Sequence, residues 1–465
     1  MTTIRLAALT ALLLSPVLAA DGDWPYWRGP QSDGNARGDA PLRWSDTENI
    51  AWKADIPGRG HSSPVIWGDR IFLTTAIRVG PEPAAPPPPP PPPAGAQGPG
   101  SGGPGGPGRR GPGGPGGFPG FGGGGPQAEH QFVVMALDRK SGKLLWQKTV
   151  KTATPHEGFH RQYGSFASNS PVTDGKLLYA FFGSRGLYCL DLDGRPIWEK
   201  DFGVAMKMRL GFGEGMAPVL DGDRLIVVFD QEGGSFMVTL DKATGKEIWR
   251  VNRDEGTNWA APLVVTHGGR KQIVVSATSK VRGYDYDSGK LLWEAGGLGA
   301  NTIPAPVAHN GMVIAMSGYR NPNLLAIKLG REGDLTGTDA IAWTNVKGNS
   351  YTPSPVLHGG KLYMLTDNGQ LSCLNAATGE PHYLQTRLPK PYNFKSSPVA
   401  VNGKLYLASE NEDVIVVKMG ETFEVLATNT LKDQTFIATP AVAGGEIYLR
   451  GQNHLFCVRG AAASR

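Results

Sequence analysis

The sequence predicts an all-β fold, an eight-bladed β-propeller with four-stranded antiparallel blades whose ring is closed by the N-terminal strand. A strand start of the form Ser/Ala/Thr-Pro, followed by an apolar run and a tight turn, recurs eight times. From Pro171 onward the starts lie 47, 44, 44, 49, 43 and 42 residues apart. Most repeats also carry a Trp near their end. A period of about 40–50 residues with several short strands per unit is typical of propellers.

Each repeat is expected to form four strands, A to D. Strand A begins at the repeated proline, and a tight turn such as Asp174-Gly175 or Asn310-Gly311 connects it to strand B, because these dipeptides favour short hairpins. Strand C is an apolar run, for example residues 133–138 and 237–241. Strand D carries Trp146, Trp198, Trp249, Trp293 and Trp343, with Tyr383 and Leu426 at the same place in two weaker copies.

The last repeat stops after its third strand, at Val458. The missing fourth strand is found at the other end of the chain, because residues 49–56 align with residues 247–253 and place Trp52 at the Trp position. We therefore expect the N-terminal strand to complete the last blade. Such closure leaves no long unpaired sheet edge.

A recurring motif connects strands C and D. In the first copy it consists of Ala136, Asp138, Ser141-Gly142 and Trp146. It resembles the tryptophan-docking motif of pyrroloquinoline quinone (PQQ) repeat propellers, and the likeness covers residues 49–79 and 130–459. The resemblance implies that each aromatic residue packs flat on the backbone of the neighbouring blade. The docking residues so implied are Trp52, Trp146, Trp198, Trp249, Trp293, Trp343 and Tyr383. It implies a fold rather than a particular chemistry.

The N-terminal region indicates export. Residues 1–20 have the charged start, apolar stretch and small-residue end of a secretory signal peptide. We expect a periplasmic or secreted protein without a lipid anchor, since no Cys follows the expected cleavage site. No later segment is apolar enough to span a membrane. Residues 21–48 contain Trp24, Tyr26 and Trp27 and are expected to pack on the propeller, which occupies residues 49–465.

Residues 80–129 interrupt the first blade between strands B and C with a Pro run and Gly-Pro-Gly repeats. Such a composition cannot bury a core, so we expect a disordered insertion that the fold tolerates.

The three cysteines, Cys189, Cys373 and Cys457, share one register position in strand C of three blades that are not neighbours. We expect them to be buried and too far apart for a disulfide. The net charge of +5 comes with no basic stripe, so nucleic acid is not an expected partner.

The long loops of this sequence all fall on one face of the predicted propeller. Nearly all A–B and C–D turns are tight, whereas every long connection is a B–C connection or an inter-blade D–A loop. Function gathers on loops held by a rigid scaffold, so we expect any ligand at the channel mouth on the long-loop face. The candidate residues are His61, Asn169, Arg185, Glu214, Asn258, Trp259, Asn301, Arg320, Tyr351 and Lys395. Taken singly, each is compatible with an ordinary polar loop residue whose substitution leaves folding intact.

Residues 156–160 match the zinc-protease pattern H-E-x-x-H. That pattern needs a helix to place both imidazoles on one metal ion. Pro155 before it and Gly158 inside it argue against a helix, so we expect no metal there and instead a loop His or Glu that contacts a ligand.

Two classes of function fit the sequence. The first is a non-catalytic binding or scaffolding platform for a protein or a polar ligand, similar to the propeller lipoprotein that assists outer-membrane protein assembly. The second, implied by the resemblance, is a PQQ- and Ca²⁺-dependent quinoprotein dehydrogenase, with Trp259 as floor and Glu214, Asn258 and Asn301 as oxygen ligands. The adjacent Cys pair usual in those enzymes is missing, which favours the platform. We expect a monomer. The outer edges of the blades with Tyr383 and Leu426 are an alternative partner site.

Overall fold

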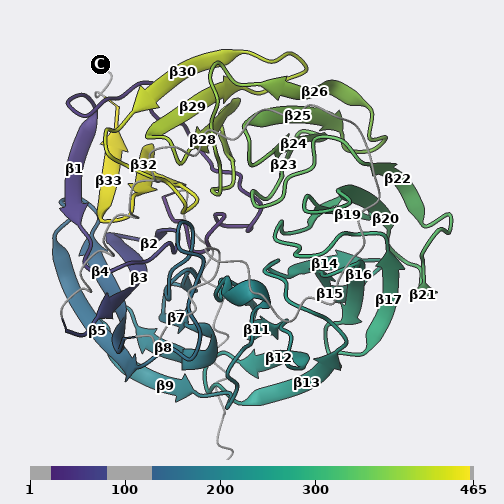
Figure 1. The fold of residues 1–465 in the computed structure, drawn as a ribbon, viewed down its shortest axis with the longest axis horizontal. Helices are drawn as coiled ribbons and strands as arrows, with labels where there is room; N and C mark the ends of the chain where they lie inside the picture. Colours follow the sequence, from purple (N-terminus) through teal and green to yellow (C-terminus); the bar gives the residue numbers. More distant parts are fainter. Residues whose placement is uncertain (1–21, 81–127, 461–465) are drawn as a thin grey trace, which may run out of the picture.

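The computed structural model describes residues 22–80 and 128–460. It is an eight-bladed propeller, so the predicted fold is confirmed (Figure 1). In the blades the strands run outward from the central axis in the order A to D. The predicted signal peptide and all but the ends of the predicted insertion lie outside the described residues.

Each blade has four antiparallel strands, which in blades 1 to 7 come from one repeat of the sequence. Blades 1 and 2 consist of β2 (Val65–Trp67), β3 (Arg70–Arg78), β4 (His130–Asp138) and β5 (Leu144–Ala153), then β6 (Val172–Thr173), β7 (Leu177–Phe181), β8 (Leu187–Asp191) and β9 (Pro196–Lys200). Blades 3 and 4 consist of β10 (Val219–Asp221), β11 (Arg224–Phe229), β12 (Ser235–Asp241) and β13 (Glu247–Arg253), then β14 (Leu263–His267), β15 (Arg270–Ser276), β16 (Lys280–Asp285) and β17 (Leu291–Gly296).

Blades 5 and 6 consist of β18 (Val307–His309), β19 (Met312–Ser317), β20 (Asn323–Lys328) and β22 (Ile341–Asn345), then β23 (Val356–His358), β24 (Lys361–Leu365), β25 (Gln370–Asn375) and β26 (Pro381–Arg387). Blades 7 and 8 consist of β27 (Val399–Val401), β28 (Lys404–Ala408), β29 (Asp413–Lys418) and β30 (Val425–Thr430), then β31 (Ala441–Ala443), β32 (Glu446–Arg450) and β33 (His454–Arg459). The described segments also hold two 3₁₀ turns, Gly183–Arg185 and Arg209–Gly211.

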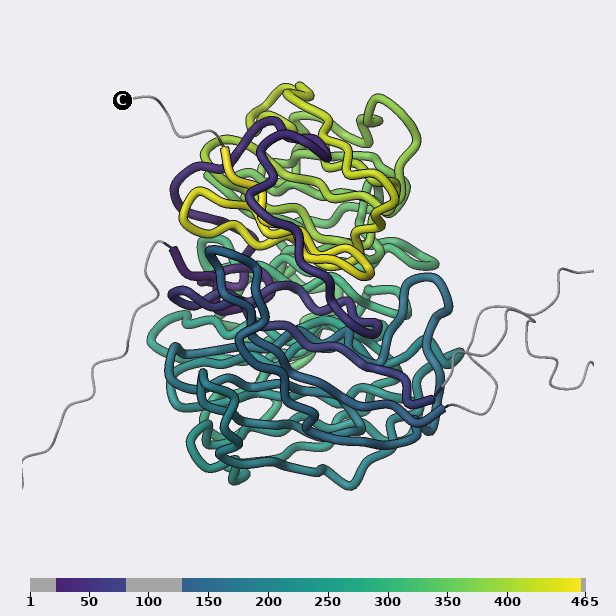
Figure 2. Tube along the Cα trace, turned by 90° about the vertical axis from the view of Figure 1, so that its left-hand side faces the viewer, coloured from purple at the N-terminus to yellow at the C-terminus, as the bar shows by residue number. Residues whose placement is uncertain are grey.

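The N-terminal strand closes the ring as predicted. β1 (Ile50–Asp55) pairs antiparallel with β33, and Trp52 lies opposite Cys457. Figure 2 shows this purple strand against the yellow C-terminal strands. The middle strands of the blades are buried on both faces, and Cys189, Cys373 and Cys457 lie in these strands as buried free thiols.

Four strand D tryptophans contact the next blade through an indole hydrogen bond and a glycine, whereas Trp343 packs on Gly379 and its Nε1 has no hydrogen-bond partner among the described residues. The Trp52 Nε1–H donates to the Arg139 carbonyl at 3.0 Å, and a Cβ added to Gly142 would lie 2.5 Å from the Trp52 ring. The indoles of Trp146, Trp198 and Trp249 donate to the carbonyls of Leu192, Lys242 and Tyr286 in the same way.

Blade 4 departs from this pattern because a fifth strand covers it. The loop between the last two strands of blade 5 crosses to blade 4, where β21 (Gly333–Asp334) pairs parallel with β17. The indole of Trp293 donates within its own blade, to Gln272 Oε1 at 2.8 Å.

The segment before β1 crosses the inner ends of several blades (Figure 1). Trp24 forms a bridge with Ile66 of blade 1, and the Tyr26 hydroxyl donates to the Leu220 carbonyl of blade 3 at 3.1 Å. Further along, Arg28 donates to the Pro355 carbonyl of blade 6, and Asn35 pairs with Ala400 of blade 7. The segment therefore spans the channel on the side of the A–B turns.

Candidate functional site

A cavity of about 1090 Å³ occupies the channel mouth on the face of the long inter-blade loops. Its rim comes from residues 156–170 and 210–217. Trp27, from the N-terminal crossing segment, also lines it. The cavity is therefore open at one end of the channel and closed at the other.

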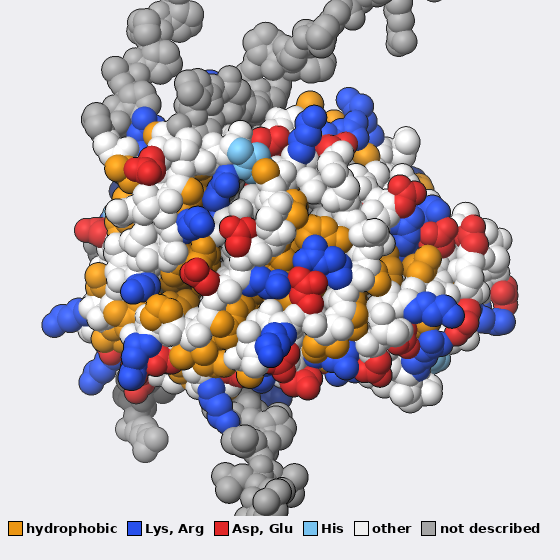
Figure 3. All heavy atoms as spheres, turned by 90° about the horizontal axis from the view of Figure 1, so that it is seen from below, with side chains coloured by type: hydrophobic (Ala, Val, Ile, Leu, Met, Phe, Trp, Pro, Cys, Tyr) orange, Lys and Arg blue, Asp and Glu red, His pale blue; other side chains and the backbone are white. Residues whose placement is uncertain are grey.

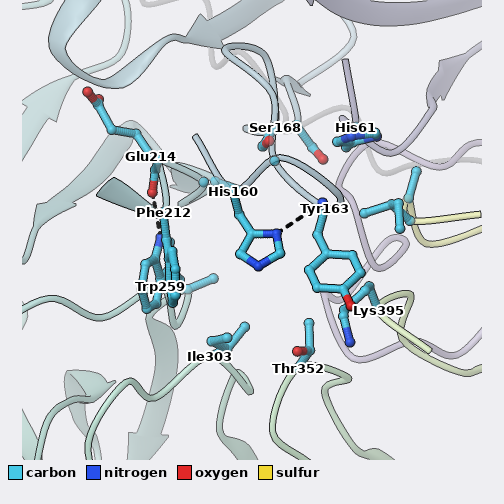
Figure 4. Close-up of a pocket in the computed structure, with 18 of the residues that line it drawn as sticks. His61, His160, Tyr163, Ser168, Phe212, Glu214, Trp259, Ile303, Thr352 and Lys395 are labelled. Carbon is cyan, nitrogen blue, oxygen red and sulfur yellow. Dashed lines mark hydrogen bonds between the residues drawn. The ribbon is translucent and has the colours of Figure 1, made fainter. Parts of the chain in front are cut away.

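Aromatic rings form much of the wall. His160 stacks on Tyr163 at 4.4 Å between ring centroids and meets the Phe212 ring edge-on at 5.1 Å. Figure 4 shows the His160 imidazole between these two rings, with Trp259 beside Phe212. The Trp259 Nε1–H donates to the Gly213 carbonyl at 2.9 Å, which fixes the indole. Rigid rings of this kind suit a flat or apolar ligand body.

Opposite this wall, Tyr351 stacks on Tyr319 at 5.2 Å between ring centroids. Arg320 lies at the cavity rim, its guanidinium 5.3 Å from the Tyr319 ring centroid. Arg320 is exposed and has no ion pair among the described residues.

A ring of hydroxyl groups holds the inner ends of the blades together. Where the residue before the repeated proline is Ser or Thr, its hydroxyl accepts a hydrogen bond from the backbone N–H of the equivalent residue in the preceding blade. The bonds run from Thr439 to Ser63 (3.0 Å), Ser63 to Ser170 (2.8 Å), Ala305 to Ser354 (2.9 Å), Ser354 to Ser397 (2.9 Å) and Ser397 to Thr439 (3.1 Å). The ring is interrupted at Ala217, Ala261 and Ala305, because an alanine cannot accept. Most of these residues line the cavity.

A lysine–carboxylate cluster forms one side of the mouth. Lys395 Nζ lies 2.9 Å from Asp367 Oδ2, 3.4 Å from Glu410 Oε1 and 4.5 Å from the Tyr163 ring centroid. Burial opposes a charged Lys395, but Asp367 and Glu410 outweigh it and hold its pKa above the ordinary value. Burial raises the pKa of Glu410, against the opposing effect of Lys395. The Lys395 side chain is only 14% exposed, so it is more buried than an ordinary polar loop residue.

Glu214 fastens two loops together. Its carboxylate accepts from the Ser184 backbone N–H at 2.5 Å and from the Ser184 hydroxyl at 2.7 Å. Burial raises the pKa of Glu214, and these hydrogen bonds act in the opposite direction. Both oxygens are therefore engaged within the protein.

The H-E-x-x-H segment is an irregular loop. His156 Nδ1 accepts from Arg185 at 2.6 Å, and its Nε2–H donates to the Met206 carbonyl at 2.6 Å. The Glu157 carboxylate accepts from the Met208 N–H at 3.0 Å. Because both His156 nitrogens are occupied, this segment does not present the ligand pair of a zinc site. In the described ranges no group of three His, Cys, Asp or Glu side chains could hold a metal ion.

Guanidinium groups without a carboxylate partner lie behind the cavity wall. Arg450 is buried and donates to the carbonyls of Ser62 and Thr74, each at 2.9 Å. Burial lowers its pKa to about 9. His61 lies between Arg450 and the cavity, and burial, then Arg450 and Arg59, lower its pKa to about 3. His61 is therefore neutral, and its Nε2 has no hydrogen-bond partner in the described segments.

The structure brings together part of the predicted site. The predicted residues that line the cavity are His61, Glu214, Trp259, Arg320, Tyr351 and Lys395. Asn169 and Arg185 line a small neighbouring void instead. Asn258 and Asn301 are buried. They were assigned by loop position, and the sequence does not show which loop side chains turn inward.

Sequence reasoning missed several lining residues. The missed aromatics are Trp27, Tyr163, Phe212 and Tyr319. Trp27 was expected to pack on the propeller, and its contact with the cavity depends on the path of the crossing segment. The hydroxyl ring did have a sequence signal, since Ser or Thr precedes the repeated proline in five blades.

The oxygen donors considered for calcium do not converge. Asn258 donates to the Asp230 carboxylate, and its Oδ1 accepts from the Ala260 N–H at 2.8 Å. Asp230 in turn holds the buried Arg253 at 2.7 Å. Glu214 is committed to Ser184. The set Glu214, Asn258 and Asn301 therefore does not fit a Ca²⁺ site, which needs six to eight converging oxygens.

The fold and its repeats define a PQQ-like repeat propeller, as the sequence resemblance indicated. A family model described as outer membrane protein assembly factor BamB matches residues 130–382, and the chain belongs to this family. A second family model, the KIB1-4 β-propeller, matches residues 302–464. No helix in the described part of the chain has the length and apolarity needed to cross a bilayer.

Individual relatives are distant. The outer membrane protein assembly factor BamB of Yersinia pestis is 20% identical over 341 residues, covering 70% of this chain and 79% of its own. A tetrathionate hydrolase of Acidithiobacillus ferrooxidans is 23% identical over 305 residues, covering 62% of this chain and 55% of its own.

Solved structures share the fold. A europium-containing methanol dehydrogenase superposes with a TM-score of 0.63 at 11% identity, over 94% of this chain and 98% of its own. The quinohemoprotein alcohol dehydrogenase of Comamonas testosteroni has a TM-score of 0.59 at 10% identity, over 97% and 82%. BamB of Moraxella catarrhalis has a TM-score of 0.50 at 13% identity, over 70% and 93%.

Proposed function

We propose that this chain is an exported binding propeller that holds an acidic ligand with a flat apolar body in the cavity at its channel mouth. The ligand is either a small molecule or a group carried by a protein partner. The observation that carries this proposal is the combination of aromatic walls with two arginines, Arg320 and Arg450, that form no ion pair among the described residues.

The charge of the site supports an acidic ligand. Lys395 is balanced by Asp367 and Glu410, so it contributes little net potential. Arg320 at the rim and Arg450 behind His61 have no carboxylate partner among the residues described. A buried guanidinium in a low-dielectric wall raises the potential over a nearby cavity.

The hydroxyl groups of the site support binding rather than chemistry. Serines of the cavity wall accept backbone N–H groups of neighbouring blades, as Ser63 and Ser170 do. Ser168 is bonded to Ser165 at 2.9 Å. A nucleophilic serine needs an adjacent base, and these hydroxyls are engaged in holding the scaffold instead.

Two dyes of the same shape test the proposal. Anilinonaphthalene sulfonate is acidic, and N-phenyl-1-naphthylamine is its uncharged counterpart. We expect the acidic dye to bind about tenfold more tightly, a difference of about 1.4 kcal/mol. Trp259→Ala should weaken both dyes, whereas Arg320→Gln should remove only the preference for the acidic one. Arg331→Gln, an exposed arginine outside the cavity lining, is the matched control.

Equal affinity for the two dyes, or binding that Trp259→Ala leaves unchanged, would contradict the proposal. PQQ is included in the same titration with and without Ca²⁺. Calcium-dependent uptake of PQQ with its absorbance would instead support the quinoprotein alternative.

A further inference from the structure

Blade 4 shows how an extended segment can be added to the outer edge of a blade. β21 pairs parallel with β17, with Trp293 opposite Gly333 and Glu294 opposite Asp334. The Leu335 N–H donates to the Glu294 carbonyl at 2.8 Å, and the Gly296 N–H donates to Thr336 Oγ1 at 2.8 Å. The added segment thus satisfies backbone groups that an outer strand otherwise leaves to water.

The added segment also buries apolar surface. Leu335 is 4% exposed and packs in one cluster with Leu292, which is 7% exposed. In blades 1 to 3 the residue at the same register, immediately before the Trp, is a large aliphatic one. These residues, Leu145, Ile197 and Ile248, are 48%, 50% and 43% exposed. The equivalent apolar surface is therefore covered in blade 4 and uncovered in three consecutive blades.

Figure 3 views the rim formed by blades 2 and 3, with apolar side chains in orange among the charged ones. Blade 1 continues this rim with Leu144, which is 56% exposed, beside Leu145. The edge that the sequence offered as an alternative partner site, at Tyr383 and Leu426, exposes less apolar surface, because both side chains are partly buried against neighbouring residues.

The charge of the edges indicates which segment fits. The segment covering blade 4 is acidic: Glu332 lies 2.5 Å from Arg270. Hydrogen bonds from Thr336, together with Lys280, lower the pKa of Asp334. β5 of blade 1 is basic, since its exposed Lys148 and Lys151 have no ion pair within the described ranges. It is also the longest outer strand described, at ten residues.

We propose that β5 is the docking edge for an extended, acidic segment of a partner protein, which adds to it as a parallel strand in the register that β21 has on β17. In this register the leucine-like side chain, equivalent to Leu335, lies opposite Lys148 and joins Leu145 as Leu335 joins Leu292, and the acidic side chain equivalent to Asp334 lies opposite Gln147, next to Lys148. This surface lies on the outer rim, apart from the cavity, so it is independent of the function proposed above.

The register of blade 1 supports this geometry. In blade 1, Thr149 follows Trp146 by three residues and lies opposite Val133. In blade 4, Gly296 follows Trp293 by three residues and lies opposite Lys280, so Thr149 and Gly296 hold equivalent positions. By this equivalence the Thr149 N–H is directed outward, like that of Gly296. Proline at an edge position removes only an outward donor, so Thr149→Pro can block strand addition while keeping the sheet.

The experiment uses the full-length protein and a synthetic peptide with the sequence of residues 329–338, in which a photoreactive benzophenone side chain replaces Leu335. We expect irradiation to crosslink the peptide mainly to residues 144–150. Leu145→Lys and Thr149→Pro should each lower this yield about tenfold. A peptide with Glu332→Lys and Asp334→Lys should also give a crosslinking yield about tenfold lower. Ala342→Lys, at the same register in blade 5, is the matched control and should leave the yield unchanged.

Circular dichroism and the melting temperature establish that each variant is folded, and the charge-reversed peptide tests the proposal on the unaltered protein. Crosslinks mapped to the cavity loops would overturn the proposal. Crosslinks to β17 alone would also overturn it, because they would mean that the peptide only replaces β21, which has the same sequence. A crosslinking yield that Leu145→Lys and Thr149→Pro leave unchanged would overturn it as well.

Discussion

At the scale of single residues, the site is defined by groups whose charge state the fold has altered. His61 is kept neutral by burial and by two arginines, and Arg450 is kept charged without a carboxylate. The sequence placed His61 on a loop that lines the cavity, but Arg450 lies on β32, at the other end of the chain. Their proximity follows from ring closure, so no local pattern could have predicted this pair.

His61 makes stability depend on pH in the acid range. Its folded-state pKa of about 3 lies below its ordinary value of 6.5, so the unfolded chain binds the proton first as the pH falls. The contribution is fully present above pH 6.5 and is lost as the pH falls toward 3, at up to about 1.4 kcal/mol per pH unit. We expect His61→Gln to lose less stability than the parent between pH 6.5 and 4 in urea unfolding.

The comparison needs a histidine that is exposed. His358→Gln serves as the control and should follow the parent curve. Parallel curves for the parent and His61→Gln would contradict the assigned pKa shift.

At the scale of elements, sequence periodicity predicted the blades because strand and turn signals are local and recur in every repeat. Strand D of the last blade was predicted from residues 49–56 for the same reason, since they match a repeat position. β21 escaped prediction, because a two-residue strand in a long loop carries no periodic signal. Its pairing depends on tertiary contact with blade 4.

The contact between Trp52 and Gly142 is expected to stabilise the closing blade. Gly142 has a φ of +70°, and a Cβ there would lie 2.5 Å from the Trp52 ring. Gly68 has a φ of +56° and no atom within 4 Å of an added Cβ, so Gly68→Ala reports the backbone strain alone. We expect Gly142→Ala to cost about 1–3 kcal/mol more than Gly68→Ala in urea unfolding, because it also overpacks the indole. An equal loss of unfolding free energy in the two variants would show that the Trp52 ring has room for the added methyl group.

At the scale of the whole molecule, the propeller is a scaffold whose channel is crossed on the A–B side by the N-terminal segment. Its outer strands differ between blades in their exposed apolar and charged side chains. The repeat predicted the face that carries the cavity, because loop lengths are visible in the sequence. It could not predict the cavity wall, because the rings of Tyr163, Phe212 and Trp259 meet only after three blades are placed side by side.

Residues 81–127 are expected to be dispensable for the fold. β3 and β4 remain paired up to Arg78 and His130, and the Val79 N–H donates to the Glu129 carbonyl at 2.8 Å. Joining Gly80 to Ala128 leaves a two-residue hairpin turn that begins with a glycine at a φ of +84°. We expect the melting temperature of this deletion to stay within about 5 °C of the parent. A larger fall would mean that the removed residues pack on the propeller.

The pairing of β1 with β33 also sets an order of events during folding. Trp52 and Cys457 are partners although 405 positions separate them, so this contact has the high sequence separation that slows folding. Until β33 is synthesised, β1 has no strand to pair with. Once β31 to β33 form, the outer edge of β33 stays unpaired until β1 docks on it. Two unfinished rings can satisfy both edges by exchanging β1, so slow closure is expected to yield a domain-swapped pair as its by-product.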